Sequence, residues 1–105
     1  MAVERLRRKL TTENLWIHIL SSLKERDMYG YEIANLLRKE KRVNVAIITV
    51  YTVLYKMERE GLIIRKSGGA LNLRKIYYGI TEKGNEAISA GIALLRDTLS
   101  SIGGV

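Results

Sequence analysis

The spacing of apolar residues along the chain predicts four helices and one β-hairpin. Three segments repeat apolar side chains at intervals of three and four residues, and a fourth, longer stripe of the same kind follows them. Two shorter segments between the third and fourth helices are typical of antiparallel strands joined by a turn at 67–69. We therefore expect helices at about 11–26, 30–40, 49–60 and 81–103, and strands at 62–66 and 74–80.

Capping and turn residues support these boundaries. Thr11 or Thr12 offers a side-chain oxygen as the N-cap of the first helix, and Thr81 does the same for the last. Gly61 stands where a left-handed residue would end the third helix. Asp27 and Met28 interrupt the helical pattern, and Tyr29-Gly30 is expected to form a turn before the second helix.

Two segments keep two interpretations open. In residues 1–10, Val3, Leu6 and Leu10 share one helical face between basic residues, which fits either a short amphipathic helix or a frayed basic arm. Residues 43–48 are apolar and β-branched, so they fit either a short strand or a buried connection.

The order of elements indicates a winged helix-turn-helix with one appended helix. This is a mainly α fold with a small β-hairpin, in the α+β class. A chain of 105 residues is long enough for one domain. We divide it into an N-terminal arm or helix (1–10), a winged helix-turn-helix (11–80) and a C-terminal dimerisation helix (81–105).

Composition excludes several classes of function. The chain has no Cys and only one His, His18, so disulfides, a thiol nucleophile and a soft-ligand metal centre are excluded. The serines lack a plausible partner base, and no Gly-rich phosphate loop is present. We expect no enzyme and no cofactor, with His18 as a surface residue.

The chain is basic, and the excess lies in its first three quarters. Its formal charge is +7, and residues 1–80 hold 16 basic against 8 acidic side chains. Such a surface favours a polyanion, although a dispersed, solvated surface is the alternative. No apolar stretch reaches the roughly 20 residues of a membrane span, and no signal peptide is evident, so we expect a cytoplasmic protein.

The third predicted helix carries the strongest functional pattern. One face is apolar, while the other presents hydrogen-bond donors, as a helix in the DNA major groove requires. An ordinary surface helix with half-buried tyrosines is the alternative. The candidate DNA-binding residues on this helix are Thr49, Tyr51, Thr52, Tyr55, Lys56 and Arg59.

The predicted hairpin adds cations beside that helix. Arg65, Lys66, Arg74 and Lys75 would place positive charge near the tip of a wing that contacts the DNA backbone. The alternative is an edge hairpin that charge protects from aggregation.

The last helix indicates self-association. Its apolar stripe is longer than one small core can cover, so part of it should face a second copy, unless it folds back on its own domain. Trp16 is expected in the core or at the dimer seam, where it could line an effector pocket. The candidate dimer residues are Ile88, Gly91, Ile92, Leu95 and Leu99.

Three blocks of the sequence resemble the PadR-like family of winged-helix transcriptional regulators. They are residues 30–33 (GYEI), residues 49–63 with Thr49-Val50-Tyr51 and the ending Glu60-Gly61-Leu62-Ile63, and residues 75–84. The family usually has Gly or Ser where Ile48 stands, Pro where Thr52 stands, and Arg or a similar polar residue where Gly79 stands. The resemblance implies a homodimer joined largely through the C-terminal helix, which usually acts as a repressor. Some relatives bind small aromatic effectors at the dimer interface.

The sequence therefore predicts a dimeric repressor that binds double-stranded DNA at specific sites, with a small aromatic effector as a candidate ligand. Two alternatives remain, a winged-helix module that binds an acidic protein, and a nucleic-acid binder without sequence preference.

Overall fold

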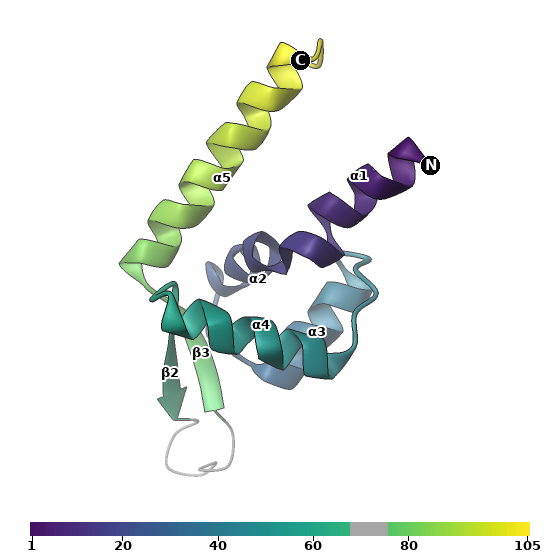
Figure 1. The fold of residues 1–105 in the computed structure, drawn as a ribbon. Coiled ribbons are helices and arrows are strands. Elements are labelled where there is room, and N and C mark those ends of the chain that lie inside the picture. The colour runs from purple at the N-terminus through teal and green to yellow at the C-terminus, as the bar shows by residue number, and fades with distance from the viewer. Residues whose placement is uncertain (68–75) are drawn as a thin grey trace.

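The computed structural model describes residues 1–67 and 76–105, in which helices form the body of the molecule and a small antiparallel sheet lies at one side of it (Figure 1). A short 3-10 helix, η1, lies between the first two α-helices. In chain order the elements are α1 (Ala2–Leu10), η1 (Thr12–Asn14), α2 (Leu15–Leu23), β1 (Met28–Tyr29), α3 (Gly30–Lys39), α4 (Ile47–Arg59), β2 (Ile63–Ser67), β3 (Ile76–Ile80) and α5 (Glu82–Ser101).

The hydrophobic core lies between α2, α3 and α4 and is closed by the sheet and the first half of α5. Ile19, Ile33 and Leu54, one from each of the three helices, are fully buried. Tyr78 of β3 and Ile88 of α5 complete the same cluster. Because burying a Leu or Ile side chain contributes about 1.5–3 kcal/mol, this cluster fixes how α4 is held against the rest of the domain.

The predicted antiparallel hairpin is confirmed, and a third strand joins it. β3 is central, with β2 on one side and β1 on the other, and Ile63 lies opposite Ile80. The sequence placed a break and a turn at Met28 and Tyr29, whereas these residues form β1, with Met28 opposite Tyr78. A strand of two residues is too short to show alternation, so only its pairing with β3 defines it. The predicted turn residues Gly68 and Gly69 lie outside the described residues.

The segment before α4 is a buried connection. Val43 and Val45 are buried, and the backbone N–H of Val43 donates to the carbonyl of Leu37 at 2.9 Å. The helix itself begins at Ile47, two residues earlier than expected. Since the β-branched run docks on the core without a neighbouring strand, its composition alone could not distinguish the two interpretations.

Helix ends agree with the sequence at two of three positions. The hydroxyl of Thr81 accepts a hydrogen bond from the N–H of Gly84 at 3.0 Å, and Gly61 has a φ of +80°. The predicted N-cap at Thr11 or Thr12 is wrong, because α2 begins after η1 with Asn14 as its N-cap. The hydroxyl of Thr11 instead donates to the carbonyl of Arg7 at 2.6 Å, at the end of α1.

Two helical arms leave the body of the molecule on the same side (Figure 1). Of residues 1–10, Ala2–Leu10 form the helix α1, and none of its residues is buried. The second half of α5 likewise carries exposed apolar side chains, including Leu94 and Leu99. The longest helix in the described part of the chain is α5 (Glu82–Ser101). No helix of the described residues, α5 included, is long and apolar enough to cross a membrane.

Candidate nucleic-acid interface

The six residues proposed on α4 are all exposed. Val50, Leu54 and Met57 form the buried face of this helix, so at 100° per residue the polar side chains turn outward. The sequence pattern therefore assigned the two faces of α4 correctly. The exposed set is Thr49, Tyr51, Thr52, Tyr55, Lys56 and Arg59.

Four residues form a line along the centre of the exposed face of α4, which we call the outward line: Ile48, Thr52, Tyr55 and Arg59. Thr52, Tyr55 and Arg59 lie on it at intervals of three and four, and the guanidinium of Arg59 stands 5.7 Å from the centre of the Tyr55 ring. Ile48 begins the same line, with 73% of its surface exposed. Ile48 is not among the residues predicted on this face, because residues 43–48 fit either a short strand or a buried connection and the helix is predicted to begin at Thr49. Extending the helical spacing one turn back from Thr52 would have found it.

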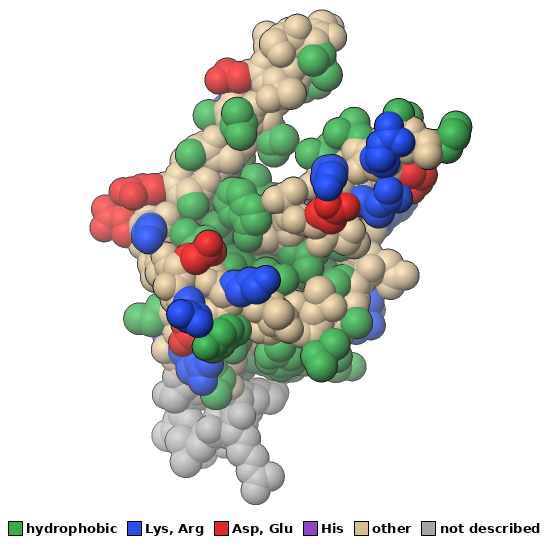
Figure 2. Space-filling view, in the orientation of Figure 1, with side chains coloured by type: hydrophobic (Ala, Val, Ile, Leu, Met, Phe, Trp, Pro, Cys, Tyr) green, Lys and Arg blue, Asp and Glu red, His purple; other side chains and the backbone are tan. Residues whose placement is uncertain are grey.

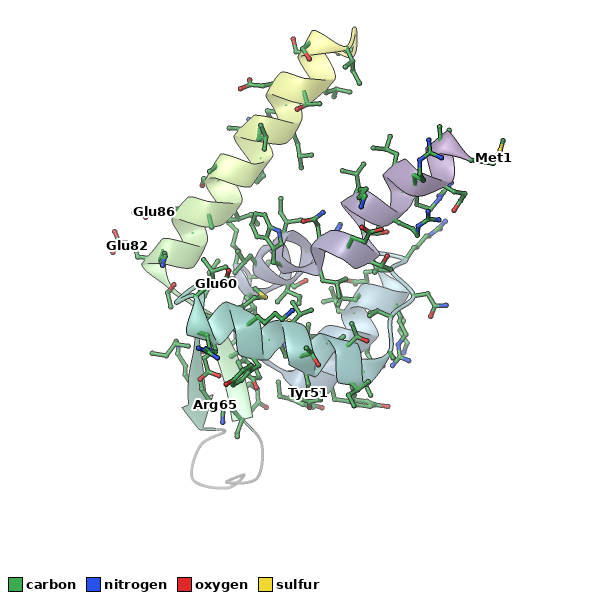
Figure 3. The ribbon with its side chains drawn as sticks, in the orientation of Figure 1. Met1, Tyr51, Glu60, Arg65, Glu82 and Glu86 are labelled. Atoms are coloured by element: carbon green, nitrogen blue, oxygen red, sulfur yellow. The ribbon has the colours of Figure 1, made fainter. Side chains whose placement is uncertain are left out.

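Tyr51 has a packing role as well as an exposed surface. Its ring lies against Gly30 at the start of α3, where an added Cβ would collide with the phenol. Gly30 therefore leaves room for the Tyr51 ring, while 44% of the Tyr51 surface stays exposed. Figure 3 shows Tyr51 and Arg65 on the side of the molecule away from α5.

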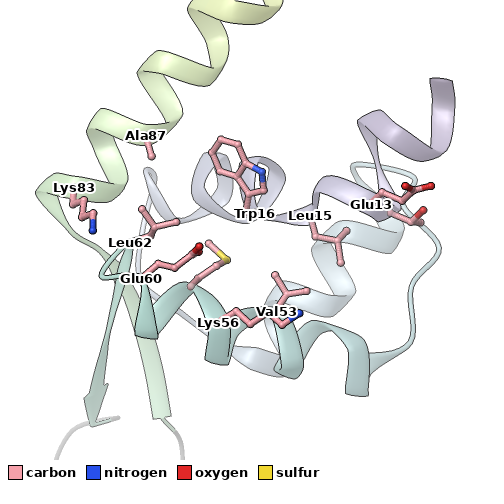
Figure 4. Close-up of a pocket in the computed structure, with 11 residues that line it drawn as sticks. Glu13, Leu15, Trp16, Val53, Lys56, Glu60, Leu62, Lys83 and Ala87 are labelled. Atoms are coloured by element: carbon pink, nitrogen blue, oxygen red, sulfur yellow. The ribbon is translucent and has the colours of Figure 1, made fainter. Parts of the chain in front are cut away.

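Lys56 lies on the flank of α4 opposite to Tyr51, beside a cavity of about 570 Å³ (Figure 4). Trp16 and Met57 contribute to the apolar part of its lining. Glu60, the C-cap residue of α4, and Lys83 of α5 add charge around the same space. The six α4 residues thus spread over a wide surface, with Lys56 at one edge and Tyr51 at the other.

The two described cations of the hairpin are each paired with a carboxylate. Arg65 of β2 donates to Glu58 of α4 at 3.1 Å, which joins the hairpin to the exposed helix. Lys66 donates to Asp27 at 3.0 Å, across β3. Gly79 leaves room for this second contact, because a Cβ there would lie 2.7 Å from the Asp27 carboxylate and 3.0 Å from the Lys66 ammonium, so these side chains would have to shift.

These pairs face opposite sides of the sheet. The register places Arg65 opposite Tyr78, which packs into the core, whereas Lys66 lies opposite Tyr77. Arg65 is thus the cation that lies on the α4 side. The other two predicted wing cations, Arg74 and Lys75, lie outside the described residues.

Tyr78 lies at the junction between β3 and α4. Burial raises the pKa of its phenol above the ordinary value, and the nearby Arg65 guanidinium lowers it in part. Glu58 and Tyr51 act in the same direction as burial. Tyr78 is therefore a neutral core residue at physiological pH, and the charge at this junction comes from Arg65 and Glu58.

Charge is distributed unevenly over the surface. Figure 2 shows Lys and Arg side chains along α1 and around the base of the hairpin, with acidic side chains among them. On α1, Arg7 pairs with Glu4 at 3.2 Å, and Lys9 pairs with Glu13 at 2.6 Å. Much of the basic character of α1 is therefore balanced by neighbouring carboxylates.

The residues proposed for a dimer interface divide into two groups. Ile88 is 2% exposed and belongs to the core of its own chain, and Ile92 packs partly against that core. Gly91 lies against Ile17 and Trp16 of α2, so the close approach it permits is within the chain. Leu95 and Leu99 remain about half exposed in the single chain.

A second cavity, of about 420 Å³, opens between α2 and the exposed half of α5. Trp16 and Ile17 line it from α2, and Leu94 and Leu95 line it from α5. Trp16 is half-buried and borders both cavities. His18, expected on the surface, is partly buried here, and its Nε2–H donates to the carbonyl of Leu10 at 2.7 Å. Within residues 1–67 and 76–105, no cluster of His, Cys, Asp and Glu could hold a metal ion.

Residues 19–90, more than half of the chain, match the model of the transcriptional regulator PadR-like family. The chain belongs to this family. A transcriptional regulator from Clostridium thermocellum is similar over 84% of this chain and 88% of its own, with 29% identity and a TM-score of 0.73. A PadR family transcription regulator from Clostridium difficile has 26% identity and a TM-score of 0.71 over 85% of this chain and 97% of its own.

The Bacillus subtilis PadR protein, whose structure is a complex with operator DNA, shares the fold. It has 23% identity and a TM-score of 0.67 over 74% of this chain and 46% of its own. No curated protein matched the sequence. This PadR-like chain is therefore a transcription regulator with a winged helix-turn-helix fold and a C-terminal helix.

Proposed function

We propose that this PadR-like protein is a homodimeric repressor that binds double-stranded DNA at specific sites and has no enzymatic activity. One observation carries the proposal. The outward line on α4 stands beside Arg65 of the hairpin, so groove-reading side chains and a phosphate-binding cation occupy one continuous surface.

In this proposal α4 enters the major groove. Thr49, Tyr51, Thr52, Tyr55, Lys56 and Arg59 offer hydroxyls and cations to base edges and phosphates. The N-cap residue of α4 is Ala46, whose side chain has no oxygen to cap the first turn. The positive end of the α4 dipole is therefore unopposed by a capping side chain, which favours a phosphate.

The hairpin supplies backbone contacts. Arg65 uses one N–H toward Glu58, and its guanidinium has further donors for a phosphate oxygen. Arg74 and Lys75 are assigned to the same role from the sequence. Lys66 is turned to the other face, and we assign it to holding the strand in place through Asp27.

Dimerisation uses the two arms. The exposed Leu95 and Leu99 of α5, together with Leu6 of α1, present apolar surface that the described chain does not cover. A second copy would bury this surface on both partners at once, because a two-fold interface uses the same residues twice. The cavity of about 420 Å³, which Trp16 of α2 and Leu95 of α5 both line, is the proposed site for a small aromatic effector.

A salt titration of duplex binding tests the proposal. Repression of this kind requires tight binding to selected sites, weaker binding to random duplex, and a steep fall of both with salt because phosphate contacts release counterions. Sites selected from random duplex provide the specific ligand. Equal affinity for selected and random duplex would support a binder without sequence preference, and absence of duplex binding would support the protein-interaction module.

A further inference from the structure

Ile48 is an apolar side chain in an unusual place. It is 73% exposed, more than any other large apolar side chain that the structure describes between Thr11 and Ile80. Its neighbours in the first turn of α4 behave differently, since Ile47 is partly buried and Val50 is fully buried. The fold therefore gains no core packing from the Ile48 side chain, and its role must be sought at the surface.

The helical position of Ile48 places it among the polar residues of α4. Steps of four, three and four residues lead from Ile48 to Thr52, Tyr55 and Arg59, which keeps all four within a narrow angle opposite the buried face. Ile48 lies in the first turn, at the end of the helix that has no side-chain cap. In helix-turn-helix proteins the N-terminal residues of the corresponding helix reach base edges.

Thr52 makes this end of the helix more apolar than its sequence suggests. Its hydroxyl donates to the carbonyl of Ile48 at 3.0 Å, so its hydrogen-bond donor is used within the helix. The Thr52 side chain is left to offer its methyl group and acceptor lone pairs. The first turn carries no acidic side chain. The N-terminal part of the outward line therefore presents mainly methyl groups.

We propose that Ile48 is a specificity-determining residue that contacts the C5-methyl group of a thymine in the major groove. This inference rests on the proposed function and names one base, thymine, that α4 would recognise. Among the four base pairs, only those containing thymine present a methyl group in that groove. Ile is stiff at χ1 in a helix, so its methyl groups are already fixed in direction and lose little freedom on contact.

The experiment removes the methyl group from the DNA and the side chain from the protein. In a selected site, each thymine is replaced in turn by deoxyuridine, which lacks only the C5-methyl group. For the wild-type protein, one such replacement should weaken binding roughly fourfold, the value of one buried apolar carbon. Ile48→Ala should bind the thymine site more weakly and show no further loss with deoxyuridine at that position.

Ile64→Ala is the matched control. Ile64 is an exposed isoleucine on β2, so Ile64→Ala removes the same kind of side chain at a position that is not on α4. This variant should keep the full wild-type sensitivity to deoxyuridine. Circular dichroism would verify that both variants fold. The proposal is overturned if the wild type tolerates deoxyuridine at every position, or if Ile48→Ala keeps the wild-type sensitivity. A protein that binds no duplex at all would instead refute the proposed function.

Discussion

Arg65 of β2 donates a hydrogen bond to Glu58 of α4 across 3.1 Å, so one ion pair joins the hairpin to the helix proposed to read DNA. The Arg65 side chain is 50% exposed and the Glu58 side chain is 29% exposed. An ion pair this open contributes at most about 1 kcal/mol to stability. Its main effect is positional, because it holds a cation beside the outward face of α4.

Replacing Arg65 by Ala should weaken binding to selected and random duplex by the same factor. Because each protomer of the proposed dimer loses one phosphate contact, the slope of log K against log salt should become shallower by about 1.8 for the dimer, at about 0.9 for each contact. Glu58→Gln keeps the cation and should keep the slope, and Glu86→Gln, which changes the net charge equally on distant α5, is the control. A changed base preference in Arg65→Ala, with an unchanged slope, would contradict this role.

Replacing both Leu95 and Leu99 by Glu should produce a monomer that binds its operator weakly. Both side chains are about half exposed in the single chain, so the variant should fold, while a dimer would have to bury four carboxylates. Light scattering measures the mass. Tyr31→Glu, at an exposed aromatic on α3, should remain dimeric. A wild type that is monomeric at high concentration would remove the dimer from the proposal.

The operator should be an inverted repeat whose half-sites lie about one helical turn, roughly 34 Å, apart. A two-fold dimer presents two copies of α4, and both reach the same side of the duplex only near this spacing or a multiple of it. Inserting about five base pairs between the half-sites should abolish tight binding, and about ten should restore part of it. If footprinting shows one short asymmetric site, and insertions leave the affinity unchanged, the result would favour a non-specific binder.

Gly84→Ala should destabilise the fold by about 1–3 kcal/mol, although Ala is the better helix former. An added Cβ at Gly84 would collide with the backbone carbonyl of Leu62, which the hairpin holds in place. Gly91→Ala is the comparison in the same helix, because its Cβ would meet the side chains of Ile17 and Trp16, whose ends can move. Thermal unfolding of both variants should show the larger loss for Gly84→Ala, and equal losses would argue against the backbone clash.

Several features of this protein follow from local sequence alone. The apolar stripe through Val50, Leu54 and Met57 determines which face of α4 is buried, so the exposed candidates on the other face were predictable. Thr81 and Gly61 mark helix ends because a hydroxyl cap and a left-handed glycine act through neighbouring backbone atoms. Both signals depend on residues within one or two turns, which is the range that a pattern in the sequence reports.

Tertiary structure decided what depends on distant partners. Met28 and Tyr29 form a strand only because β3 lies beside them, and Lys66 reaches Asp27 across β3, where Gly79 leaves space between the two side chains. In the long stripe of α5, Ile88 enters the core of its own chain while Leu99 stays exposed, although both belong to one apolar face. Periodicity identifies a face of a helix, but the packing of other elements along that helix determines where its burial ends.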